Sequence, residues 1–216
     1  MNEFSVTRPV KKRQRQRFFN GETAFAAISE WDKNLEVFGF TKGQFSMVDL
    51  LEAVLQKTGP ADVVISTWTA ASADLSRVES FINKGRMSSA LWLVDHSFKS
   101  RQPVFCQQLQ DTFGADCIRT IATHAKFVLL KNSDWSVVMQ TSMNLNQNKR
   151  IENFCIADDK ELYALFDGLV RDIFDLQPAG VGFDGNGSRR ARELDELGTA
   201  EKGDFYDVIP AAALLS

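Results

Sequence analysis

Metal-binding residues are scarce in this sequence. It contains three cysteines, Cys106, Cys117 and Cys155, which form no CxxC pair, and two histidines. No cluster with the spacing of a zinc site can be built from them, so we expect neither a metal nor another cofactor. The absence of a recognisable disulfide framework is typical of reducing compartments, and we expect a cytoplasmic protein.

Long apolar runs are also missing. No uninterrupted run approaches the roughly 20 residues that a bilayer span requires, and the N-terminal segment is basic and polar where a secretory signal would be apolar. We therefore expect no membrane span. The formal net charge of -3 argues against a uniformly basic protein that coats nucleic acid. Any polyanion must then bind to a local patch.

The two ends of the chain differ from its middle. Residues 8–17, RPVKKRQRQR, include six basic residues and no acid, which predicts a flexible basic arm over residues 1–17. Glycine and charge dominate the sequence from about residue 184, which predicts a polar, flexible tail over residues 184–216. A globular domain is expected over residues 18–183. With 44% hydrophobic residues, the chain can bury one substantial core.

Apolar runs alternate with helical patterns inside this domain. The patterns predict strands at residues 35–40, 62–66, 90–94, 117–121, 125–131 and 135–140, and helices at residues 47–57, 74–84, 103–113 and 159–174. Asn132, Ser133 and Asp134 supply turn residues between the last two strands, so these strands should form an antiparallel hairpin. The pattern predicts an α/β sandwich whose mixed sheet is flanked by helices.

One segment gathers polar residues at a single end of the expected sheet. His124 and Lys126 are two residues apart at the start of a strand, so their side chains should share a face of the sheet. The hairpin returns the chain to the same end at Ser142 and Asn144, which share a face for the same reason. Glu152 follows within reach of that end. We expect these five side chains to converge.

These residue types suit the chemistry of a phosphodiester. A histidine can attack phosphorus, a lysine supplies a fixed positive charge, and serine and asparagine donate hydrogen bonds to non-bridging oxygens. Glu152 can accept a hydrogen bond from one imidazole nitrogen and leave the other nitrogen free to attack. The segment therefore predicts a site that binds and cleaves a phosphodiester.

The order H-x-K, hairpin, S-x-N and then a glutamate resembles the HKD motif of the phospholipase D superfamily. Members of that family cleave or transfer phosphodiesters through a phosphohistidine, without a metal. The resemblance implies a phospholipase D-like fold and a catalytic set in which His124 is the nucleophile, Lys126 and Asn144 hold the phosphate, Ser142 donates a nearby hydrogen bond and Glu152 supports the histidine. The chain departs from the family pattern at two positions, with Lys131 in place of an aspartate and Thr141 in place of a glycine.

Family members use two copies of the motif, and this chain carries one. The resemblance is closest to small single-motif endonucleases, in which a two-fold axis joins two copies in one cleft. It therefore implies a homodimer, in which the second imidazole protonates the leaving oxygen. His96, the other histidine, follows Asp95 without a nearby lysine and is expected to be a loop residue.

Three functions remain open at this point. The first is a metal-independent nuclease that cleaves DNA or RNA, which the short chain, the single motif and the basic arm favour. The second is a non-catalytic protein that binds nucleic acid or another partner on the same scaffold. The third is a phospholipid hydrolase or transferase, against which the lack of an amphipathic membrane helix counts.

Two further features bear on nucleic-acid binding. The arm contains cations that can each contact a phosphate, or that can simply be solvated: Lys11, Lys12, Arg13, Arg15 and Arg17. Ser66, Thr67 and Trp68 end a predicted strand and can line the cleft. Trp68 can stack on a base there, or can be an ordinary core or rim tryptophan.

Overall fold

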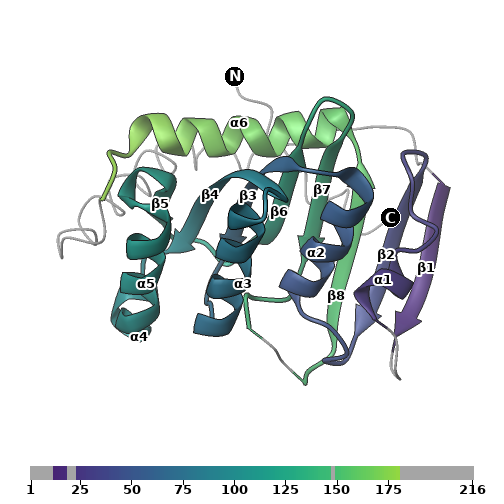
Figure 1. The fold of residues 1–216 in the computed structure, drawn as a ribbon, viewed down its shortest axis with the longest axis horizontal. Coiled ribbons are helices and arrows are strands. Elements are labelled where there is room, and N and C mark those ends of the chain that lie inside the picture. Colours follow the sequence, from purple (N-terminus) through teal and green to yellow (C-terminus); the bar gives the residue numbers. More distant parts are fainter. Residues whose placement is uncertain (1–11, 19–22, 147–148, 181–216) are drawn as a thin grey trace, which may run out of the picture.

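A mixed sheet lies between two helical layers (Figure 1). The computed structural model describes residues 12–18, 23–146 and 149–180. Within these residues the sheet has 8 strands in the order β1-β2-β8-β7-β6-β3-β4-β5. The strands are β1 (Lys12–Phe18), β2 (Leu35–Thr41), β3 (Ala61–Thr67), β4 (Met87–Asp95), β5 (Ile118–Ile121), β6 (Lys126–Lys131), β7 (Ser136–Thr141) and β8 (Glu152–Asp158). The prediction of an α/β fold with a mixed sheet flanked by helices is confirmed.

Helices cover both faces of this sheet. They are α1 (Ala24–Ala27), α2 (Met47–Thr58), α3 (Ser72–Asn83), α4 (Phe98–Arg101), α5 (Pro103–Phe113) and α6 (Lys160–Leu176). In Figure 1, α6 lies along one face, and α2, α3 and α5 pack on the other. None of the helices in the described part of the chain is both long and apolar enough to cross a membrane.

Alternation along the central strands divides the apolar side chains between two cores. In β3, Val63 and Ile65 belong to the larger core under α2 and α3, whereas Val64 faces the opposite way. Val64 joins the smaller core, in which Tyr163 and Val170 are the buried residues of α6. Successive residues of a strand point to opposite faces, so a strand buried on both faces is apolar throughout. This explains the continuous apolar runs of the sequence.

Side-chain caps fix where the helices α2 and α6 begin. Ser46 Oγ accepts a hydrogen bond from Asp49 N at 3.2 Å, and Asp49 Oδ2 accepts one from Ser46 N at 2.7 Å, which forms a capping box at the start of α2. At the start of α6, Asp159 Oδ1 accepts hydrogen bonds from the backbone N of Glu161 and Leu162. Such caps satisfy amide groups that have no partner within the helix.

The prediction of a flexible arm over residues 1–17 is wrong for residues 12–17. They form β1, which pairs in parallel with β2 from Lys12 opposite Leu35 to Phe18 opposite Thr41. Alternating arginine and glutamine suits an edge strand, because charged residues there discourage pairing with further chains. Residues 1–11, including Lys11, and the predicted tail at 184–216 lie outside the described residues.

The sequence pattern also left β8 unassigned. This strand pairs antiparallel with β7 on one side and with β2 on the other, and its residues Phe154 and Ile156 are fully buried. It belongs at the centre of the sheet, between the predicted hairpin and β2. The short helices α1 and α4 were missed as well, since four residues give too little periodicity to recognise.

Candidate active site

The sheet register brings the predicted polar residues to one edge of the sheet. Lys126 at the start of β6 pairs with Thr141 at the end of β7, and Thr141 pairs with Phe154 of β8. Because β6 also runs antiparallel to β3, with Phe127 opposite Ser66, the end of β3 reaches the same edge. The starts of β6 and β8 and the ends of β3 and β7 therefore surround one place.

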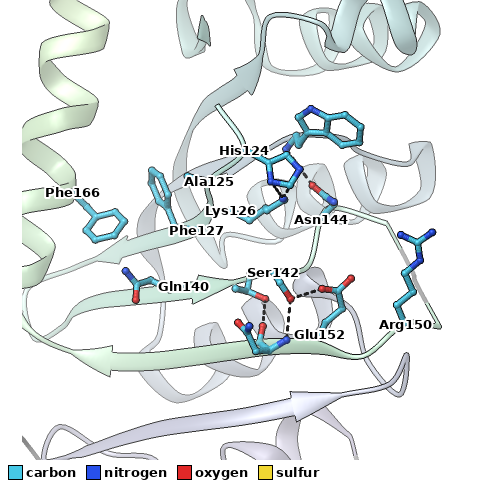
Figure 2. Close-up of a pocket in the computed structure, with 13 residues that line it drawn as sticks. His124, Ala125, Lys126, Phe127, Gln140, Ser142, Asn144, Arg150, Glu152 and Phe166 are labelled. Atoms are coloured by element: carbon cyan, nitrogen blue, oxygen red, sulfur yellow. Dashed lines mark hydrogen bonds between the residues drawn. The ribbon is translucent and has the colours of Figure 1, made fainter. Parts of the chain in front are cut away.

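An open pocket of about 690 Å³ lies at this edge (Figure 2). All five side chains that the sequence predicted to converge line it: His124, Lys126, Ser142, Asn144 and Glu152. The prediction that they gather at one spot is confirmed. Their individual catalytic roles stay predictions.

His124 is exposed and lies in the loop just before β6, and the two peptide groups that follow it are held in place by hydrogen bonds. Ala125 N donates to Thr123 Oγ1 at 3.1 Å, and Ser66 Oγ donates to Ala125 O at 2.9 Å. The imidazole contacts Lys126, whose Nζ lies 2.9 Å from Nδ1 and 3.2 Å from Nε2. The ammonium group can therefore donate to whichever ring nitrogen lacks a proton. The loop therefore holds the imidazole at the pocket in contact with Lys126.

Lys126 has an altered acidity. Burial disfavours its charged form and lowers its pKa from the ordinary value of 10.5, and the negative charge of Glu152 offsets only part of this effect. The ammonium group therefore loses its proton at a lower pH than an exposed lysine does. A partly desolvated cation also interacts more strongly with a bound phosphate, because less water screens the charge.

Ser142 and Glu152 form a hydrogen-bonded pair across β7 and β8. Ser142 Oγ donates to Glu152 Oε2 and accepts a hydrogen bond from Asn153 N at 3.0 Å. The carboxylate of Glu152 is thus directed at Ser142 in this structure, and the sequence pattern had paired it with the imidazole instead. The support of His124 by Glu152 stays a prediction.

Asn144 is oriented by the backbone at the end of β3. Its Oδ1 accepts a hydrogen bond from Trp68 N at 3.3 Å. An amide side chain has one acceptor oxygen and one donor group, so this contact leaves the NH2 end to donate to an oxygen of a substrate. Figure 2 shows Asn144 beside His124, where such a donor would meet a phosphate attacked by the imidazole.

The two positions that depart from the family motif have structural roles here. Thr141 is buried, and its Oγ1 donates to Asn153 O at 2.7 Å and accepts from Met143 N at 3.0 Å. It therefore ties β7 to β8 directly before Ser142. Lys131 lies at the far end of β6 from the pocket, with its Nζ 5.2 Å from the centroid of the Tyr163 ring. Neither departure removes a residue from the pocket.

Several pocket residues were missed by the sequence pattern. Trp68 lines the pocket, which supports the cleft-lining interpretation for that residue, but Ser66 and Thr67 are fully buried and point elsewhere. The pocket-lining residues that were missed, apart from Ala125, are Phe127, Gln140, Arg150, Asn153 and Phe166. Arg150 stands between the S-x-N pair and Glu152 in the sequence, and this position was the one available signal for it.

The remaining candidates lie apart from this group. His96 is an exposed residue after β4, as expected for a loop histidine, and its Nδ1 is 3.7 Å from Asp95 Oδ2. In the sheet order, β2 and β8 separate β1, with Lys12, Arg13, Arg15 and Arg17, from β7. Across residues 12–18, 23–146 and 149–180, no three side chains of histidine, cysteine, aspartate or glutamate group as metal ligands would.

Comparisons with known proteins give weak likenesses. No protein-family model and no curated protein matches the chain. Polyphosphate kinase from Porphyromonas gingivalis is similar in structure with a TM-score of 0.48 and 11% identity, over 74% of this chain and 28% of that one. NucT from Helicobacter pylori is similar with a TM-score of 0.47 and 11% identity, over 65% of this chain and 96% of that one. Phosphatidylserine synthase from Haemophilus influenzae Rd KW20 is similar with a TM-score of 0.46 and 14% identity, over 66% of this chain and 38% of that one.

The chain therefore spans less than half the length of the kinase and of the synthase. Likenesses of this strength identify neither a family nor a substrate for this chain.

Proposed function

We propose that this protein is a metal-independent phosphodiesterase of the phospholipase D type, and that it acts as a nuclease on DNA or RNA. One observation carries the proposal: His124, Lys126, Ser142, Asn144 and Glu152 line a single open pocket. Together they offer a nucleophile, a cation and neutral donors, which is the set that phosphoryl transfer through histidine requires. Covalent attack by an imidazole needs no metal to activate water in its first step.

The reaction proceeds in two displacements. An unprotonated ring nitrogen of His124 attacks phosphorus, the bond from phosphorus to the leaving oxygen breaks, and that oxygen takes a proton from a second imidazole. Water then attacks the phosphohistidine and gives its proton to the second imidazole, which releases His124 and a phosphomonoester. Lys126 and the NH2 group of Asn144 stabilise the charge on the non-bridging oxygens in both steps. Atoms and protons balance over the cycle.

The experiment that tests this proposal is a trap for the covalent intermediate. An oligonucleotide with a radiolabelled phosphodiester is mixed with excess protein in EDTA and quenched in alkali within milliseconds to seconds. We expect label on the protein that is stable to alkali, is released by acid, and maps to the peptide containing His124. Phosphoramidates have this pattern of stability. Cleavage without labelled protein, or label on another residue, contradicts the phosphohistidine route.

The second imidazole is expected to come from a second copy of the chain. His96, the other histidine of the sequence, follows β4 and does not line the pocket. A two-fold axis near the pocket would bring two His124 side chains together, one as nucleophile and one as acid. Sedimentation at assay concentration should then show a species of twice the 24.2 kDa chain mass. A fully active 24.2 kDa monomer contradicts this part of the proposal.

Nucleic acid is the substrate class that the charge pattern favours. Lys11, Lys12, Arg13, Arg15 and Arg17 stand close together in the sequence, and each can contact a phosphate of a polynucleotide. Replacing Arg13, Arg15 and Arg17 with glutamine should flatten the salt dependence of binding, by roughly 0.7 to 0.9 in log-log slope per lost contact. Fluorescence anisotropy with a labelled oligonucleotide at several salt concentrations measures this slope.

Substitution with glutamine, which β1 already contains, is chosen because a deletion would remove this edge strand. An unchanged slope would show that these arginines do not contact the nucleic acid. Release of a phospholipid headgroup from vesicles, with oligonucleotides left intact, would favour the lipid hydrolase instead.

A further inference from the structure

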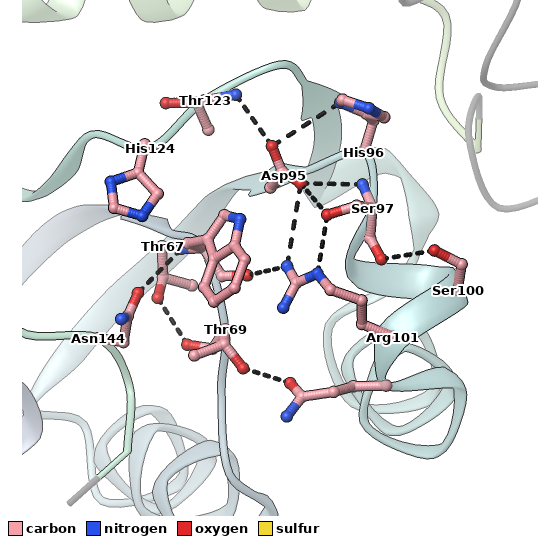
Figure 3. Close-up of polar contacts among 12 residues, drawn as sticks. Thr67, Thr69, Asp95, His96, Ser97, Ser100, Arg101, Thr123, His124 and Asn144 are labelled. Carbon is pink, nitrogen blue, oxygen red and sulfur yellow. Dashed lines mark hydrogen bonds and ion pairs between the residues drawn. The ribbon is translucent and has the colours of Figure 1, made fainter. Parts of the chain in front are cut away.

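A buried carboxylate behind the nucleophile joins three segments of the chain (Figure 3). Asp95 ends β4 and is only 6% exposed. Its Oδ2 accepts a hydrogen bond from Thr123 N at 3.1 Å, and its Oδ1 accepts one from Ser97 N at 2.9 Å. The hydroxyl of Ser97 also donates to Oδ1. Burying a carboxylate is costly unless donors surround it, and here both oxygens have them.

Thr123 directly precedes His124, so the hydrogen bond from Thr123 N to Asp95 Oδ2 fixes the backbone next to His124. Thr123 also accepts the hydrogen bond from Ala125 N described above. Asp95 therefore holds a residue that in turn holds the peptide group after His124. This is a direct route from the carboxylate to the backbone that carries the imidazole.

A second route passes through Arg101. Its Nη2 lies 3.9 Å from Asp95 Oδ1 and donates to Trp68 O at 2.7 Å, and its Nε donates to Ser97 Oγ at 2.8 Å. The guanidinium carbon lies 3.6 Å from the centroid of the Trp68 ring, which is a cation–π contact. Arg101 thereby fixes both the backbone and the ring of Trp68.

Trp68 in turn contacts two residues of the pocket. The centroid of its ring is 5.6 Å from that of the His124 imidazole, with the ring planes tilted by 57°. Its backbone N is the donor that orients Asn144. The second route thus ends on the nucleophile and on the amide that faces the phosphate.

We propose that Asp95 is a positioning residue that sets the imidazole of His124 through these two routes. The proposal rests on the proposed function, since it concerns the nucleophile of that reaction. Asp95 itself does not line the pocket. Its effect is geometric: a nucleophile displaced by about 1 Å can lose about 100-fold in rate, because attack needs contact distance and alignment.

The test is Asp95→Asn, which keeps the shape of the side chain but has one acceptor oxygen. Its NH2 group must face either Thr123 N or Ser97 N, both donors, and its neutral amide no longer attracts Arg101. We expect kcat for oligonucleotide cleavage to fall about 10- to 100-fold while KM stays within about threefold, because no group that contacts the substrate has changed. The matched control is Asp62→Asn, an exposed carboxylate at the far end of β3 that accepts a hydrogen bond from Ser89. Its kcat should match that of the wild type.

A second measurement separates this inference from the proposed function. The side-chain nitrogen and proton signals of His124 are recorded by NMR, and His96→Ala assigns them, since the chain has two histidines. We expect the His124 signals to shift or broaden in Asp95→Asn and to stay unchanged in Asp62→Asn. A wild-type protein that cleaves no phosphodiester would refute the proposed function, yet these signals would still test the positioning.

Two results would overturn the inference. One is a kcat for Asp95→Asn equal to that of the wild type, and the other is a set of His124 signals that Asp95→Asn leaves unchanged. If Asp95→Asn does not fold, Arg101→Met replaces it, because this side chain lies closer to the surface and its loss interrupts only the second route. His124 signals that Arg101→Met leaves unchanged would likewise overturn the inference.

Discussion

Replacing His124 with alanine is expected to lower phosphodiesterase activity by at least about 1,000-fold, because the proposed mechanism loses its nucleophile. The exposed position of His124 at the pocket makes the substitution structurally mild, since no apolar contact of the core is lost. Cleavage of single-stranded and plasmid DNA and of RNA in EDTA measures the loss. The unfolding temperature should stay close to that of the wild type.

The matched control for this prediction is His96→Ala. It removes the other histidine of the chain, which is also exposed and lies outside the pocket. We expect its activity to stay near that of the wild type. Activity in His124→Ala equal to that of the wild type would exclude the covalent mechanism. Equal losses in both variants would point to a general effect of losing a histidine.

Replacing Lys126 with methionine is expected to lower kcat/KM by about 100- to 1,000-fold, which is the usual cost of losing one charged or hydrogen-bonding group that stabilises a transition state. Methionine keeps most of the length of the side chain and removes the charge. The control is Lys131→Met on the same strand, since Lys131 is exposed at the opposite end of β6. Steady-state kinetics on one oligonucleotide compares the two variants.

The lowered pKa of Lys126 adds a test by pH. As the pH rises, the ammonium group deprotonates below the ordinary value of 10.5, and attraction to phosphate is lost. The His124→Ala variant is expected to bind a dinucleotide phosphodiester without cleaving it. Its affinity should decrease as the pH rises, and this decrease should begin at a lower pH than an ordinary lysine with a pKa of 10.5 would give. An added Lys126→Arg should remove the fall, because arginine stays charged. Isothermal titration measures both, and the same alkaline fall in both variants would contradict the assignment.

Much of the fold could be predicted from local patterns. The segments at residues 62–66, 125–131 and 135–140 each contain three or four consecutive apolar residues, and they form the strands β3, β6 and β7 at the centre of the sheet. Strands buried on both faces carry this signal strongly. β1 and β8 were both missed because polar residues conceal their strand pattern. The composition of β1 is that of a solvated segment, and β8 begins at Glu152, where polar residues obscure the apolar alternation of Phe154 and Ile156.

The sequence by itself determined which polar residues meet at the pocket, because His124 and Lys126 stand at the start, and Ser142 and Asn144 at the end, of a hairpin that local patterns predict. Tertiary structure alone decided which other side chains contact these residues. Asp95 and Arg101 meet Trp68 beside His124 although Trp68 comes from a different segment, and Glu152 bonds to Ser142 because β8 lies beside β7. Contacts between distant segments depend on strand order and register, and a one-dimensional pattern does not record them.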